Sequence, residues 1–177
     1  DYGKLLGNEP ADLVFTDPPY NVPIDGHVSG KGAVHHREFA MASGEMSSEA
    51  FTTFLTETLS AMAQHCRNGA IAFVCMDWRH MRELLDAGHA VFDELKNLCV
   101  WNKTNGGMGT FYRSKHELVF VWKVGSDPHT NSFGLGDTGR YRTNVWQYRG
   151  VNTMRAGRME ELAQLTGRRH SDKLLTY

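Results

Sequence analysis

The chain has 177 residues, of which 41% are hydrophobic and 22% are charged, and its formal net charge is −1. This length and composition predict one globular domain that can bury a sizeable core. No apolar run approaches the roughly 18 residues that span a membrane, and the N-terminus has no signal-peptide profile, so we expect a cytoplasmic protein rather than a membrane or secreted one.

The first predicted element is a short strand. Residues 12–16, DLVFT, form an apolar run of β-forming residues, and Pro18 and Pro19 end it because proline has no backbone N–H and fixes φ. We expect this strand to be buried. Residues 21–46 are rich in Gly, Ser and His without an apolar period, which predicts a long mobile loop that is either functional or disordered.

A helix and a second strand are predicted next. Ser47 or Ser48 can cap a helix with apolar residues at every third or fourth position, and Asn68-Gly69 is expected to end it. These apolar residues are Phe51, Phe54, Leu55, Leu59 and Met62. The continuously apolar run at 70–76 predicts a strand that is covered on both faces.

The pattern then repeats. A second helix is expected at about 77–87, with Gly88 as its stop signal. Two further strands are expected at 94–103 and 116–124, joined by a glycine-rich loop at 104–114. Alternating strands and helices indicate βαβ units, so the predicted fold class is α/β with a mainly parallel sheet.

The stretch VFTDPPYN, at 14–21, combines groups that suit one chemical task. It lies at the carboxyl end of a strand, where open parallel sheets bind ligands. The Asp17 carboxylate and the Pro18 carbonyl are two acceptors for one amino group, and Tyr20 offers a flat face to a planar ring. An exocyclic amine of adenine or cytosine would fit, and Asp17 or water could take its proton after attack on an electrophile. The alternative is a strand-ending turn.

TDPPYNV, at 16–22, resembles the catalytic motif of the amino-methylating DNA methyltransferases, which use S-adenosylmethionine. Residues 100–123, VWNKTNGGMGTFYRSKHELVFVWK, are similar to a later block of the subgroup in which the catalytic motif precedes the cofactor motif. The two blocks follow that subgroup's order and spacing. The resemblance implies a Rossmann-like S-adenosylmethionine-dependent methyltransferase fold, incomplete in this chain.

The resemblance implies roles for four residues at the strand end. Asp17 and the Pro18 carbonyl would hold the target amine, Pro19 would stiffen the backbone, and Tyr20 would stack on the base. Asp17 is also the one residue assigned to cofactor binding. Aspartate at the first position of the motif favours adenine over cytosine in this family. The target base is rotated out of the duplex, at a cost of about a few kcal/mol.

The glycine-rich loop is expected to contact DNA. Its glycines would let the backbone approach the extruded nucleotide, its aromatic residues would stack, and its basic residues would contact phosphates. These candidates are Gly106, Gly107, Gly109, Phe111, Tyr112, Arg113 and Lys115. The alternatives are a plain hairpin loop and, for the two aromatic residues, packing in the core.

Basic residues gather in the second part of the chain. Residues 101–177 hold 12 Lys and Arg against 6 Asp and Glu, whereas residues 1–100 hold 7 against 14. Arginines that include Arg140 and Arg142 alternate with aromatic residues after residue 125, which predicts a nucleic-acid surface; a solvated loop is the alternative. The predicted organisation is a partial catalytic domain at 1–125, a DNA target-recognition segment at 126–160, and an unassigned tail at 161–177. A short helix is expected at 158–165.

The glycine-rich cofactor loop of the family, a D-P-F-x-G-S-G-like turn, is not found in the sequence. TGRR, at 166–169, resembles what often follows that loop, so we expect a stretch to be missing before it. The sequence also begins without methionine, which suggests a fragment. We therefore expect the activity to belong to the full enzyme.

Other residues that could form a site are expected to be structural. None of the nine histidines pairs with cysteine at metal-ligand spacing, so no metal site is predicted. Trp78 and Trp122 are expected in the core, and Asp77 is expected to cap a helix rather than line the site. The cysteines expected to be reduced and buried are Cys66, Cys75 and Cys99.

Together these patterns predict a bacterial or phage enzyme of the restriction–modification type. It would transfer a methyl group from S-adenosylmethionine to the exocyclic amine of adenine in double-stranded DNA. Cytosine-N4 methylation, an RNA target and a non-catalytic DNA-binding remnant are the alternatives. The recognition sequence and the oligomeric state stay open, a homodimer being one option.

Overall fold

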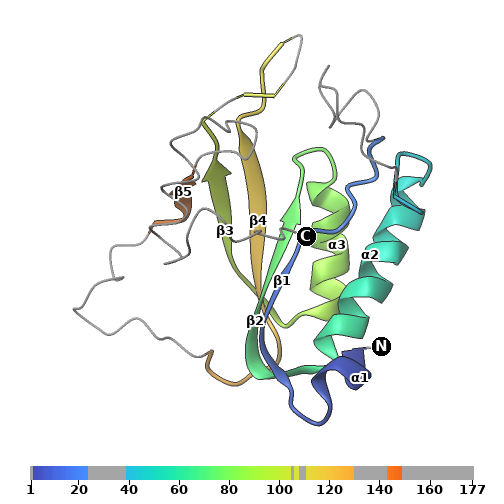
Figure 1. The fold of residues 1–177 in the computed structure, drawn as a ribbon, viewed down its shortest axis with the longest axis vertical. Helices are drawn as coiled ribbons and strands as arrows, with labels where there is room; N and C mark the ends of the chain where they lie inside the picture. The colour runs from blue at the N-terminus through green and yellow to red at the C-terminus, as the bar shows by residue number, and fades with distance from the viewer. Residues whose placement is uncertain (1, 24–38, 105, 108–110, 130–142, 149–177) are drawn as a thin grey trace, which may run out of the picture.

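The computed structural model of the protein describes residues 2–23, 39–104, 106–107, 111–129 and 143–148. They form a five-stranded sheet with two long helices on one face (Figure 1). The strands are β1 (Ala11–Thr16), β2 (Cys66–Met76), β3 (Glu94–Asn102), β4 (His116–Lys123) and β5 (Val145–Gln147). The helices are α1 (Tyr2–Leu6), α2 (Ser48–Ala63) and α3 (Met81–Val91). The predicted α/β class is confirmed.

The sheet has the order β1-β2-β4-β3-β5. β1 is parallel to β2 and β5 is parallel to β3, whereas β4 is antiparallel to both of its neighbours. The sheet is therefore mixed: four of the five described strands run in one direction, but two of the four neighbouring pairs are antiparallel. β4 runs the other way because it forms an antiparallel hairpin with β3, in which Asn102 pairs with His116.

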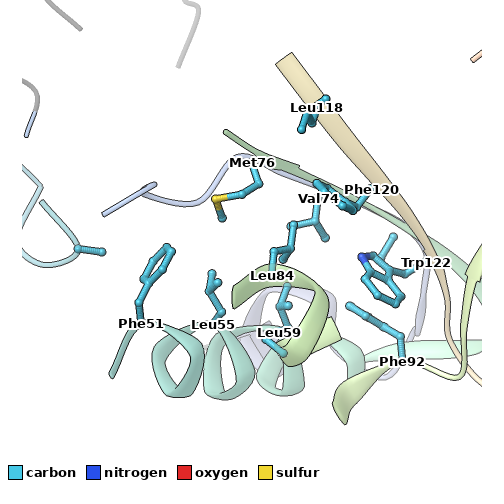
Figure 2. Close-up of a cluster of buried hydrophobic side chains, with 13 residues drawn as sticks. Phe51, Leu55, Leu59, Val74, Met76, Leu84, Phe92, Leu118, Phe120 and Trp122 are labelled. Atoms are coloured by element: carbon cyan, nitrogen blue, oxygen red, sulfur yellow. The ribbon is translucent and has the colours of Figure 1, made fainter. Parts of the chain in front are cut away.

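The main core lies between the sheet and helices α2 and α3 (Figure 2). Phe51, Leu55 and Leu59 recur at every fourth position of α2, so one face of that helix is buried. Ser47 caps α2 as predicted, because its hydroxyl oxygen accepts the backbone N–H of Ala50 at 3.2 Å. The sheet contributes alternate residues, including Trp122, which is fully buried as expected.

Two glycines do not stop helices as the sequence suggested. α2 already ends at Ala63, and Gly69 lies inside β2 with a φ of +85°, where a Cβ would come within 2.7 Å of the Pro128 carbonyl oxygen. Gly88 lies inside α3, which continues to Val91. A Cβ on Gly88 would lie 2.6 Å from Cη2 of Trp122, so this glycine lets the helix approach the tryptophan ring.

Some expected burial is also wrong. β1 is an edge strand among the described strands, and its Leu13 and Phe15 side chains are 58% and 61% exposed. Trp78, expected in the core, is 51% exposed. A short apolar run shows that a strand exists but not how many of its sides are covered. β5 lies in the predicted recognition segment, and it pairs with β3 and adds Trp146 to the sheet.

Both ends of the predicted loop at 21–46 are anchored to the core. The side chain of Asn21 accepts the backbone N–H groups of Gly44 and Met46, at 3.0 and 3.2 Å, and donates to the Met46 carbonyl at 2.9 Å. Ala42 is fully buried. The middle of this loop, at 24–38, lies outside the described residues, as does the helix expected at 158–165.

Cys75 and Cys99 are buried and Cys66 is partly buried, and all three are free thiols. Within the described ranges, no three or more His, Cys, Asp or Glu side chains are grouped so that they could hold a metal ion. None of the helices described is long and apolar enough to cross a membrane.

Candidate active site

The strand directions bring the predicted site segments to one edge of the sheet. β1, β2, β3 and β5 all end there, and β4 begins there. The segment at 17–20, the β2–α3 connection at 77–80 and the β3–β4 connection at 103–115 therefore share this carboxyl edge. In Figure 1 the connection at 77–80, the end of β3 and the start of β4 all lie at the upper end of the sheet. Ligands in such sheets bind beyond this edge.

Asp17 and Tyr20 are in direct contact at the end of β1. The Tyr20 hydroxyl donates a hydrogen bond to Oδ1 of Asp17 at 2.5 Å. Asp17 is exposed, whereas Pro18, Pro19 and Tyr20 are half-buried. The prolines thus carry an exposed carboxylate on a short backbone segment that has lost much of its freedom. Oδ2 of Asp17 has no hydrogen-bond partner within the described part of the chain, so it can accept a ligand proton.

The register of the sheet places two more groups beside Asp17 and Tyr20. Phe15 pairs with Phe73, so one step of two residues places Asp17 beside Cys75, on the face opposite α2 and α3. Cys75 pairs with Val119, and Glu117 lies two residues before Val119 on the same face. This period-two placement follows from the strand pairing, which the sequence alone does not supply.

The surroundings hold Tyr20 and Cys75 in their neutral forms. Burial is the largest cause of the raised pKa of Tyr20, and the Asp17 charge raises it further through the field and the hydrogen bond. Burial also raises the pKa of the Cys75 thiol to about 12, with the charges of Asp17 and Glu117 as smaller causes. Tyr20 therefore keeps the proton that it donates to Asp17.

Lys103 places a positive charge beside Glu117. The Lys103 ammonium forms an ion pair with Glu117, and it lies 5.4 Å from the centre of the Trp101 ring. The backbone N–H of Lys103 donates to the Lys115 carbonyl at 2.8 Å, which closes the base of the β3–β4 connection. Sequence reasoning missed Cys75, Lys103 and Glu117 because none belongs to a recognisable motif and only the pairing of β2, β3 and β4 brings them together.

The β3–β4 connection presents two aromatic rings to solvent. Phe111 and Tyr112 are 86% and 85% exposed, and their rings meet edge to face with centres 4.4 Å apart. The alternative that they pack in the core is therefore wrong. The Arg113 guanidinium donates to the carbonyls of Gly107 and Gly106, at 2.8 and 3.1 Å, so it also stiffens the connection.

Asp77 caps the turn before α3 and not the helix itself, because α3 begins at Met81 rather than at about residue 77 and its N-cap residue is His80. Its Oδ1 accepts the backbone N–H groups of Arg79 and His80, at 3.1 and 3.0 Å, and lies 2.9 Å from Nδ1 of His80. The remaining site candidates, Gly109, Arg140 and Arg142, lie outside the described residues.

The described residues place the Asp17 carboxylate at the carboxyl edge of the sheet, but they form no cradle for the methionine end of S-adenosylmethionine. Such a cradle needs backbone N–H groups exposed by a glycine-rich turn between a strand and a helix. The β2–α3 connection, Asp77-Trp78-Arg79-His80, contains no glycine. The described residues therefore do not form this part of a cofactor site.

A protein-family model matches most of the chain. The model of a family described as DNA methylase matches residues 11–170. Comparison with curated protein sequences gave no significant match.

Solved structures of other proteins share the fold. The M1.HpyAVI–SAM complex is 12% identical with a TM-score of 0.51, and the match covers 92% of this chain and 68% of that one. TTHA0409 of Thermus thermophilus, complexed with S-adenosyl-L-methionine, is 15% identical with a TM-score of 0.54 and coverage of 93% and 71%. The cytosine-N4-specific PvuII DNA methyltransferase is 13% identical with a TM-score of 0.54 and coverage of 98% and 64%. At these identities the likeness establishes the fold alone.

Proposed function

The chain belongs to the DNA methylase family, and on that premise we propose that it transfers a methyl group from S-adenosylmethionine to the exocyclic amine of adenine in double-stranded DNA. The observation that carries this proposal is the exposed Asp17 carboxylate, which Tyr20 holds at the carboxyl edge of the sheet. Two of the similar solved structures contain S-adenosylmethionine, which supports the choice of cofactor.

Asp17 and the Pro18 carbonyl act as acceptors for the two N–H bonds of the target amine. The amine lone pair is delocalised into the ring, and the two acceptors favour the tetrahedral geometry in which it is free. The half-buried ring of Tyr20 supports the flat face of the base, a contact worth about 1–3 kcal/mol in nucleic-acid sites. Position and charge therefore supply most of the rate.

The reaction balances without a strong base. Bound S-adenosylmethionine would supply an electrophilic methyl group on a positively charged sulfur. The amine lone pair would then form the new N–C bond as the C–S bond breaks, and that bond's electron pair would stay on sulfur. The amine proton becomes acidic as the N–C bond forms, and Oδ2 of Asp17 or water accepts it. Because the Cys75 pKa is about 12, this neighbour stays a thiol and does not compete as a thiolate nucleophile.

Adenine is proposed over cytosine because aspartate occupies the first position of the motif. The fold does not distinguish the two bases, since a cytosine-N4-specific enzyme shares it. On the DNA side, the proposal assigns the exposed rings of Phe111 and Tyr112 to stacking and the basic chain of Lys115 to phosphate. Arg113, Gly106, Gly107, Arg140 and Arg142 complete the proposed DNA contacts.

The test is methyl transfer from labelled S-adenosylmethionine to unmethylated DNA, followed by mass analysis of the digested nucleosides. The Asp17→Ala variant is expected to lose at least about 100-fold in kcat, because an acceptor and proton carrier at the reacting nitrogen is removed. Its affinity for DNA should change little. Asp12→Ala is the matched control, since Asp12 is an exposed aspartate near the other end of β1.

Each outcome has a clear reading. If the digested product contained N4-methylcytosine, the target base would be cytosine and not adenine. Equal activity of Asp17→Ala and the unmodified protein would refute the role of Asp17. DNA binding without any transfer would favour the non-catalytic alternative.

A further inference from the structure

The β2–α3 connection presents a tryptophan and an arginine at the edge that carries Asp17. Trp78 follows the end of β2 by two residues and is half-exposed. Because β2 lies between β1 and β4 in the sheet, Trp78 lies along the carboxyl edge between the segment at 17–20 and the connection at 103–115. Neither Trp78 nor Arg79 has a role in the proposed chemistry.

The pair is held on a rigid base. The Arg79 guanidinium lies 4.7 Å from the centre of the Trp78 ring, over one face. The Asp77 carboxylate, whose side chain is only 14% exposed, accepts the Arg79 backbone N–H at 3.1 Å and lies 3.3 Å from its Nη1. Asp77 Oδ1 also accepts the backbone N–H of His80 at 3.0 Å, so the turn that carries the pair is held at more than one point. A ring and a cation fixed before binding cost little entropy when a ligand arrives.

A single exposed tryptophan is common on protein surfaces and needs no function. Trp78 is not a single case, because other exposed aromatic residues occur at the same edge. Phe111 and Tyr112 extend from the β3–β4 connection, and Tyr148 directly follows the end of β5. Arg113 is bonded to carbonyl oxygens, so no carboxylate neutralises it among the contacts of the described residues. Exposed aromatic rings beside arginine side chains are typical of a surface that binds nucleic acid.

We infer that Trp78 and Arg79 form a DNA contact separate from the β3–β4 connection. The free face of the indole stacks on a base or sugar next to the extruded nucleotide, while Arg79 binds a backbone phosphate. This inference rests on the proposed function only for the class of partner, which is double-stranded DNA.

The test measures DNA affinity of the full chain by fluorescence anisotropy. The probes are a labelled duplex of mixed sequence and the same duplex with one mismatched adenine, which unpairs at lower cost. Trp78→Ala is expected to weaken binding by about tenfold, and more on the mismatched duplex, without changing the salt dependence. Arg79→Gln should weaken binding several-fold and lower the slope of log K against log salt by about one. Trp78→Phe, which keeps a ring, should retain most of the affinity.

Two matched controls separate this contact from general effects. Tyr2→Ala removes an exposed aromatic ring from α1, near the opposite edge of the sheet, and Arg82→Gln makes the same charge change within α3. Both should bind like the unmodified protein. Circular dichroism melts would confirm that every variant is folded.

The inference is overturned if Trp78→Ala and Arg79→Gln bind like the controls, or if the unmodified chain does not bind duplex DNA. It fails separately from the proposed function. If Trp78→Ala weakened DNA binding but the protein transferred no methyl group, only the proposed activity would be contradicted. If the protein transferred methyl groups but Trp78→Ala bound DNA normally, only this inference would be contradicted.

Discussion

The Tyr20 hydroxyl donates to Oδ1 of Asp17 at 2.5 Å, so the residue proposed to stack on the base also orients the carboxylate proposed to accept its amine. The raised pKa of Tyr20 keeps the phenol protonated, and a protonated phenol is the form that can donate. The Tyr20 side chain therefore influences both where the base lies and how the Asp17 carboxylate is oriented. Substitutions at Tyr20 can separate the two contributions.

Tyr20→Phe keeps the ring and removes the hydrogen bond. Because a hydrogen bond to a charged group contributes about 1.5–3 kcal/mol, we expect kcat to fall by about 10- to 100-fold with KM nearly unchanged. Tyr20→Ala should lower kcat further and also raise KM, since the stacking surface is lost. Steady-state kinetics with DNA as the varied substrate would measure both constants.

Tyr2→Phe is the control for Tyr20→Phe, since it removes a hydroxyl from an exposed ring of α1 that has no role in the proposed site. It should leave kcat unchanged. If Tyr20→Phe also kept the kcat of the unmodified enzyme, the hydrogen bond to Asp17 would have no part in catalysis.

The sequence predicted those features of the fold that local chemistry determines. The Ser47 cap, the apolar face of α2 and the strand end at Thr16 each depend on residues a few positions apart, and the structure confirms them. The family, and with it the α/β fold, could be identified because two motif blocks occur in order.

The features that the sequence did not predict depend on residues far apart in the chain. Gly88 looked like a helix stop because its contact with Trp122, 34 positions away, is invisible in a local pattern. The exposure of Trp78 depends on where β2 ends, and the grouping of Cys75 with Glu117 depends on strand register. Apolar composition alone determines neither.

Gly88→Ala tests the contact between α3 and the sheet. Alanine favours a helix over glycine by about 1 kcal/mol, so local propensity alone predicts a more stable protein. The added Cβ would lie 2.6 Å from Cη2 of Trp122, however, and overpacking of this kind costs about 1–3 kcal/mol. We therefore expect a lower free energy of unfolding, measured by urea denaturation.

A double-mutant cycle would identify the cause. Trp122→Phe shortens the ring that the new Cβ meets, so Gly88→Ala should cost less in that background than in the unmodified protein. Equal costs in the two backgrounds would mean that the loss does not come from the Trp122 contact.

Asn21→Ala tests how the ends of the long β1–α2 connection are held. Asn21 has a φ of +52° and makes three hydrogen bonds to Gly44 and Met46, so alanine loses the bonds and keeps the strained backbone. With about 1 kcal/mol for each bond, we expect a loss of about 2–4 kcal/mol in the free energy of unfolding. Thermal melts would measure stability, and limited proteolysis would show faster cleavage within 39–47.

Asn21→Asp is the informative partner of that variant. Aspartate keeps the acceptor for the two backbone N–H groups and loses only the donor to the Met46 carbonyl, so it should be less destabilising than alanine. If the two substitutions cost the same, the acceptor bonds contribute nothing to the anchoring of the connection.

The raised pKa of Cys75 predicts how the free energy of unfolding changes at alkaline pH. Its pKa is raised from 9.0 to about 12 in the folded protein, mainly by burial, so in that interval the unfolded chain has lost a proton that the folded protein still holds. The stabilisation is complete below pH 9 and is lost as the pH rises toward 12, with a slope of up to about 1.4 kcal/mol per pH unit. The raised pKa of Tyr20 acts in the same direction from its ordinary value of 10.0 upward.

Urea denaturation of Cys75→Ala at several values between about pH 8 and 10.5 isolates the thiol's share of this decline. The variant should show a flatter decline than the unmodified protein, even though it starts less stable because a buried side chain is shortened. Parallel declines in the two proteins would show that the Cys75 thiol has the same proton affinity folded and unfolded, which contradicts its burial beside Asp17 and Glu117.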